Sequence, residues 1–212
     1  MSHEELANPE LAGVEVIEDS GDLSRSDVIL KGALAAGAVY GTFMVGPYVR
    51  KALAMSGGSD VDILNFALTL EYLESSFYDE AKTRAKASGE LKSLIGLLAS
   101  DEKQHVEALT ATIKSLGGKP VAEPKFDFPY GNTTGFLKLA QTFEDTGVSA
   151  YNGAAPSIKA KEVLASAGAI VQVEARHAAA IRLQNSAEPA PEAFDPPLDE
   201  AQVLKAVEPF IA

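Results

Sequence analysis

Two segments of this chain place a glutamate and a histidine three residues apart inside stretches that otherwise have the pattern of buried helices. The first is EKQH, residues 102–105, and the second is EARH, residues 174–177. Leucine and isoleucine recur around both at three- and four-residue steps, the spacing of one helix face. Because residues i and i+3 share a face, both Glu-x-x-His pairs should point into the core. The fold must therefore accommodate two buried polar pairs.

The helical period continues over four long segments, residues 60–86, 90–116, 134–154 and 160–185. Each would be roughly 37 Å long if it has about 25 residues at 1.5 Å per residue. Short links join the first two and the last two, which predicts two antiparallel hairpins, whereas residues 117–133 can recross the full length of a bundle. We predict an all-α four-helix bundle in which one long crossover connects the two hairpins.

We divide the chain into four parts: an acidic N-terminal arm (1–30), an apolar segment (31–56), the bundle (57–186), and a proline-rich tail with a short C-terminal helix (187–212). Residues 32–49 are uncharged, and three interpretations stay open: a degenerate export signal, a membrane or oligomer-contact segment, and an ordinary core helix. The first two favour the cell envelope, export or membrane association. The alternative is a cytoplasmic protein.

Composition narrows the chemistry. The chain has no cysteine, so disulfides, thiolate metal ligands and thiol nucleophiles are excluded, and His, Asp and Glu remain as the strong metal ligands. With 30 acidic against 18 basic residues the net charge is −12, which argues against nucleic acid as a partner.

Single glutamates lie on the expected inner faces of the other two long helices. Glu71 and Glu144 are each followed seven positions later by a tyrosine, Tyr78 and Tyr151. Glu74 is the competing candidate on the first helix, because it lies one turn beyond Glu71. The glutamates and tyrosines recur at an offset of 73 residues and the Glu-x-x-His pairs at 72, so the candidates form an internal repeat.

In an antiparallel bundle these positions meet at one level. Four buried carboxylates and two imidazoles cannot remain uncompensated there, since isolated buried charges cost many kcal/mol. Two divalent cations balance the four negative charges, and mixed oxygen and imidazole ligands suit Fe or Mn better than Ca or Mg. We predict a two-metal site whose ligands are Glu71, Glu102, His105, Glu144, Glu174 and His177. The neighbouring Asp101 and Glu107 are expected to be solvated.

On these motifs, residues 57–212 resemble the ferritin-like superfamily. LNFALTLEYLESSFY, SDEKQHVEAL, VEARHAAAIR and AFDPPLDEAQVLKAVEPFI are similar to segments of bacterial ferritin-like-domain proteins related to plant desiccation-related proteins. The resemblance implies distinct roles: terminal ligands Glu71 and Glu144, bridging carboxylates Glu102 and Glu174, one imidazole per metal from His105 and His177, and hydrogen bonds to the ligands from Tyr78 and Tyr151.

Two functions follow from this site. In the first, an Fe or Mn pair reacts with O2 or peroxide, giving metal oxidation or protection against oxidative or desiccation stress. In the second, the protein is not an enzyme, and the metals stabilise a structural, assembly or stress-protective bundle. Residues 32–49 would then supply a contact with a membrane or a second copy.

Overall fold

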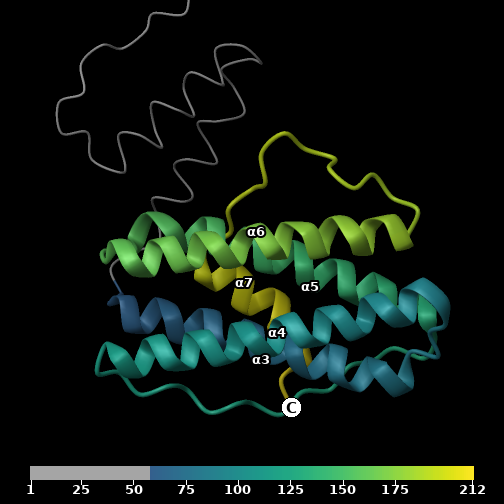
Figure 1. The fold of residues 1–212 in the computed structure, drawn as a ribbon, viewed down its shortest axis with the longest axis horizontal. Coiled ribbons are helices and arrows are strands. Elements are labelled where there is room, and N and C mark those ends of the chain that lie inside the picture. The colour runs from purple at the N-terminus through teal and green to yellow at the C-terminus, as the bar shows by residue number, and fades with distance from the viewer. Residues whose placement is uncertain (1–57) are drawn as a thin grey trace, which may run out of the picture.

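The computed structural model describes residues 58–212; the predicted arm at 1–30 and the apolar segment at 31–56 lie outside the described residues. The described part of the chain is helical, as predicted, and its elements are the long helices α3 (Asp60–Arg84), α4 (Gly89–Ser115), α5 (Thr133–Ala154) and α6 (Lys161–Gln184), then α7 (Glu200–Val207), with 3-10 turns η2 (Ala155–Ser157) and η3 (Glu208–Phe210) (Figure 1). From residue 58 onward, none of the helices combines the length and hydropathy of a membrane span.

Local capping sets where the bundle helices begin and end. Ser59 and Asp62 form a reciprocal capping box at the start of α3, in which the Ser59 hydroxyl accepts from the Asp62 amide. Asn132 accepts from Gly135 at the start of α5. Helix α4 ends before Gly117, whose φ of 76° lies in the left-handed region that glycine adopts without strain.

The crossover between α4 and α5 runs along the whole of α3, as the length of residues 117–133 predicts. At one end, the Val121 amide donates to the Asn65 side chain near the start of α3. At the other, the Thr133 hydroxyl donates to the Ala85 carbonyl just beyond its end. The bundle therefore consists of two hairpins, α3–α4 and α5–α6, joined by one long connection (Figure 1).

Two apolar clusters fill the bundle on either side of a polar middle layer. One is rich in aromatic side chains, with Phe77, Phe136 and Phe143 at its centre. The other is mainly aliphatic, and includes Leu68 and Ile113. On each long helix the candidate ligands fall between residues of the two clusters, so the four helices bring them to one level.

The C-terminal residues close the aromatic end of the bundle. Asp199 and Gln202 form a capping box that starts α7. Phe210 then packs edge-on against Phe143, with ring centroids 4.9 Å apart, and its carbonyl accepts from the Asp127 amide of the crossover. The short C-terminal helix predicted from the sequence is thus present, and it shields the aromatic cluster from water.

Candidate metal centre

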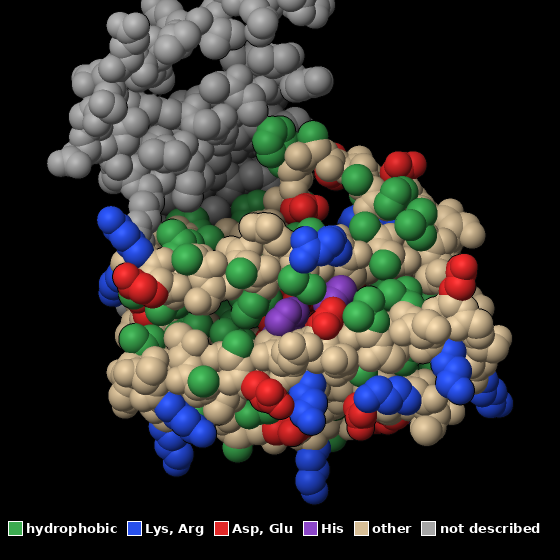
Figure 2. All heavy atoms as spheres, viewed as in Figure 1, with side chains coloured by type: hydrophobic (Ala, Val, Ile, Leu, Met, Phe, Trp, Pro, Cys, Tyr) green, Lys and Arg blue, Asp and Glu red, His purple; other side chains and the backbone are tan. Residues whose placement is uncertain are grey.

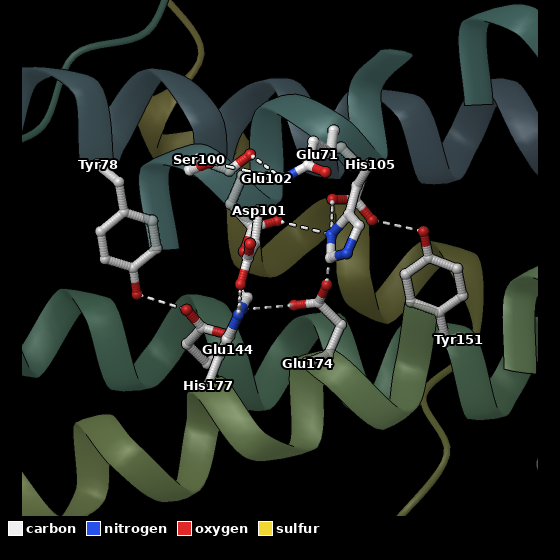
Figure 3. Close-up of polar contacts among 11 residues, drawn as sticks. Glu71, Tyr78, Ser100, Asp101, Glu102, His105, Glu144, Tyr151, Glu174 and His177 are labelled. Carbon is white, nitrogen blue, oxygen red and sulfur yellow. Dashed lines mark hydrogen bonds and ion pairs between the residues drawn. The ribbon is translucent and has the colours of Figure 1, made fainter. Parts of the chain in front are cut away.

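All six predicted ligands meet in the polar middle layer, and each is buried (Figure 3). Helices α3 and α5 each contribute one glutamate, and α4 and α6 each contribute a Glu-x-x-His pair. The helical period explains the placement, because each of these side chains continues the apolar face of its helix. Their ligand atoms fall into two groups, and within each group all the atoms lie within 4.8 Å of one another.

The first group surrounds His105. Its Nδ1 lies 2.9 Å from Glu174 Oε1, 3.1 Å from Glu102 Oε2 and 3.2 Å from Glu71 Oε2. Its imidazole therefore faces carboxylates from three different helices.

The second group surrounds His177. Its Nδ1 lies 2.8 Å from Glu102 Oε1, 3.7 Å from Glu144 Oε2 and 3.9 Å from Glu174 Oε2. Glu102 and Glu174 thus belong to both groups and present one oxygen to each, which is the arrangement that two bridged cations require.

Tyrosines from the opposite hairpin hold the outer glutamates. The Tyr78 hydroxyl of α3 donates to Glu144 Oε1 of α5, and the Tyr151 hydroxyl of α5 donates to Glu71 Oε1 of α3, both at 2.5 Å. Burial raises the pKa of both phenols well above the usual range, so they stay protonated as donors. The second oxygen of each glutamate is left facing the middle of the site (Figure 3).

Several of these inward-facing atoms make no hydrogen bond of normal geometry, although some of them lie within ion-pair distance of a histidine nitrogen. They include Glu71 Oε2, Glu144 Oε2, both oxygens of Glu174, Glu102 Oε1 and His177 Nδ1. Buried polar atoms nearly always have a hydrogen-bond or metal partner. The atoms here are carboxylate oxygens and imidazole nitrogens, which can act as metal ligands, and they converge in two groups. The donor set therefore fits two divalent cations.

The electrostatics of the protein without metal point the same way. Burial raises the pKa of Glu71 to about 7 and raises those of Glu144 and Glu174 as well. Burial alone would lower the pKa of His105, but its contacts with Glu102, Glu174 and Glu71 outweigh this and raise it to about 12. The folded chain thus retains protons where two cations could replace them.

Glu74, the competing candidate on α3, is buried but belongs to neither ligand group. Burial and the nearby charge of Glu174 raise its pKa well above the usual range. It fits because α5 has Gly147 opposite, where an added Cβ would lie 3.2 Å from Glu74 Oε1. Helical spacing could not separate Glu71 from Glu74, since residues three apart share a face.

The prediction that Asp101 is solvated is wrong. Its side chain is only 28% exposed, and its Oδ2 lies 3.2 Å from His177 Nε2 on the neighbouring α6. This contact depends on how α4 and α6 pack against each other, which residue spacing does not show. The one hint in the sequence was that Asp101 directly precedes a predicted metal ligand. Glu107 is exposed, as predicted.

A cleft between α4 and α6 leads to the histidines. It has a volume of about 420 Å³, and both imidazoles line its floor between apolar walls that include Leu98 and Val173. Both rings are visible from outside, in a hollow between the two helices (Figure 2). Small molecules can therefore approach the site from this side.

Comparisons with known proteins agree with this architecture. Residues 59–186 match the family described as the ferritin-like domain. A conserved hypothetical protein from Mycobacterium tuberculosis shares the fold at 15% identity and a TM-score of 0.55, over 61% of this chain and 99% of that one. A ferritin-like, diiron-carboxylate protein from Bacillus anthracis str. Ames does so at 24% identity and a TM-score of 0.51, over 59% and 94%.

No curated protein sequence gives a significant match. The predicted relation to desiccation-related proteins therefore stays a prediction. The family match covers more than half of the chain and includes all six residues of the site. This chain belongs to the ferritin-like domain family.

Proposed function

We propose that the protein binds two Fe or Mn ions in the middle layer and that the bound pair reacts with O2 or peroxide. The observation that carries the proposal is the combination of two ligand groups sharing Glu102 and Glu174 with a cleft that reaches both histidines. A metal site that serves only to stabilise a fold is typically closed by its ligands, whereas a reactive one keeps an approach open.

The residues around the predicted site would have different roles in binding the metal ions. Glu102 and Glu174 would hold the two ions beside each other, because each presents one oxygen to each group. The tyrosine hydroxyls fix Glu71 and Glu144, so that the free oxygen of each stays aimed inward. The bound pair would supply the electrons that reduce O2 or peroxide. The apolar clusters on both sides exclude water, and the cleft remains as the route for the oxidant.

The second function remains a specific alternative. The ligands come from all four long helices, so binding alone would tie the two hairpins together and stabilise the fold. On that alternative the protein would be a metal-stabilised structural or stress-protective bundle without turnover.

Metal stoichiometry and oxidant consumption separate the two functions. Full-length protein is stripped with chelator and loaded with Fe²⁺ or Mn²⁺, and O2 or H2O2 consumption is then followed. We expect two ions per chain and oxidant consumption well above the rate of free metal. The Glu102→Gln variant should lose both, because it removes a shared carboxylate. Glu107→Gln, an exposed glutamate on the same helix, should behave as wild type.

The outcomes are distinct. Two ions bound without consumption of either oxidant would favour the structural alternative. A stripped protein that binds neither metal would contradict both functions. Comparing O2 with H2O2 identifies the oxidant, and comparing Fe²⁺ with Mn²⁺ identifies the preferred metal.

A further inference from the structure

The two halves of the site are related by the internal repeat, but the repeat is broken beside the histidines. The offset of 72 residues that relates Glu102 to Glu174 places Asp101 of α4 in register with Val173 of α6. Both residues line the cleft. One half of the site thus has a carboxylate where the other half has an isopropyl group.

Asp101 contacts the histidine of the opposite hairpin. Its Oδ2 lies 3.2 Å from His177 Nε2, while His177 Nδ1 faces Glu102 inside the site. A carboxylate in this place accepts a hydrogen bond from Nε2–H, which keeps the proton on Nε2 and leaves the Nδ1 lone pair free for a metal. It also fixes the ring and makes the imidazole a stronger ligand.

His105 has no such support. The side chain of Val173, the counterpart of Asp101, cannot accept a hydrogen bond, and among the described residues none makes a polar contact with His105 Nε2. Its Nδ1 faces the glutamates, but none of the described carboxylates accepts a hydrogen bond from its Nε2–H. The side chain of His105 is also more exposed, 11% against 5% for His177.

A second break in the repeat lies beside the same half of the site. The offset of 73 residues places Glu74 in register with Gly147. The missing side chain at Gly147 leaves space for the Glu74 carboxylate near Glu174 Oε2, the oxygen that belongs to the His177 group. The repeat therefore adds a carboxyl group beside an oxygen of the His177 group, where the other half has a glycine.

We propose that the two metal positions are inequivalent and that the position at His177 binds a divalent cation more tightly than the position at His105, with Asp101 as the positioning residue. The inference rests on the proposed two-metal site. It assigns an order of filling, with the His177 position first. The more weakly held ion is then the one at His105.

Crystals of the stripped protein with one equivalent of Co²⁺ per chain test this directly. Anomalous scattering from cobalt reports the occupancy of each position. Loss of such a carboxylate partner typically costs 10- to 100-fold in metal affinity. When two independent sites share one equivalent of metal per chain, the ratio of their occupancies is the square root of the ratio of their affinities. We therefore expect about threefold to tenfold more cobalt at His177 than at His105.

Two reciprocal variants make the test specific. Asp101→Val copies the α6 residue into α4 and should bring the occupancy ratio close to one. Val173→Asp copies the α4 residue into α6, and should also equalise the positions, by strengthening His105. Glu107→Gln is the matched control and should keep the wild-type ratio. Because the two variants act on opposite halves, a folding defect in one leaves the other informative.

The failures are distinguishable. Two Co²⁺ bound at excess metal, but equal occupancy at one equivalent, would overturn this inference and leave the proposed function intact. A higher occupancy at His105, or a ratio unchanged in both variants, would overturn it as well. No Co²⁺ at either position, even in excess, would contradict the proposed two-metal site and this inference with it.

Discussion

Phe77 and Glu71 lie on the same helix, and both are fully buried, but their burial has opposite energetic consequences. Phe77 stacks on Phe136 and meets Phe143 edge-on, so its burial stabilises the fold under any condition. Glu71 faces other carboxylates and an imidazole, and its burial is unfavourable unless protons or cations compensate it. The aromatic layer should therefore stabilise the bundle unconditionally, whereas the contribution of the polar layer should depend on metal and pH.

The largest expected effect tests the metal dependence of the polar layer. When the free metal concentration is about a hundred times the dissociation constant, each bound ion adds about 2.7 kcal/mol to the free energy of unfolding. Two such ions therefore add roughly 5 kcal/mol. Calorimetry with Mn²⁺ should show a large rise in Tm that chelator reverses. Glu102→Gln should abolish most of this rise. Identical melting curves with metal and with chelator would contradict the expectation that the stability contributed by the polar layer depends on metal.

A substitution in the aromatic cluster should lower stability by the same amount whether or not metal is bound. Phe77→Ala should lower the free energy of unfolding by about 3–5 kcal/mol, because the cavity forms among rigid rings. Urea denaturation should give a similar loss with metal and with chelator. Leu183→Ala provides the control, since Leu183 is 60% exposed and its truncation should change stability by less than about 0.5 kcal/mol.

The metal-free protein should lose stability as pH rises. Burial lifts the pKa of Glu71 from an ordinary 4.5 to about 7, so between these values the folded chain binds more protons than the unfolded chain. The other buried glutamates with raised pKa values and both histidines act in the same direction. The Tm of stripped protein should therefore fall from pH 4.5 upward. The stabilisation by metal should grow with pH, because protons compete for the ligands. A flat metal-free profile would contradict the assignment.

The smallest expected change in stability concerns Glu74. Like the predicted ligands it is buried, but it belongs to neither of the two ligand groups. Glu74→Gln removes an acid that the folded chain keeps protonated and the unfolded chain ionises. Metal-free protein carrying the substitution should therefore be more stable than wild type at pH 8, because the unfolded wild-type chain is favoured by ionising Glu74. At pH 4 the gain should vanish, since both states are then protonated. An equal effect at both pH values would show that packing, not charge, explains the change.

Much of the architecture could be predicted from the sequence. The helical period placed the ends of α3 through α6 within about two residues of their observed positions, and the length of residues 117–133 predicted the crossover. The all-α bundle and the ferritin-like superfamily are confirmed. The six predicted ligands come together because each continues an apolar face, and packing such faces inward leaves them no other place.

Which side chains face the core could be predicted from residue spacing, since that depends only on the position of each residue within one helix. What each side chain contacts there depends on how the helices pack against one another. Asp101 contacts His177 because α4 and α6 pack side by side, and the space at Gly147 buries Glu74 beside the site without placing it in either ligand group. The tyrosines likewise bind glutamates of the opposite hairpin. These contacts depend on distances between helices, which the periodicity of a single helix does not encode.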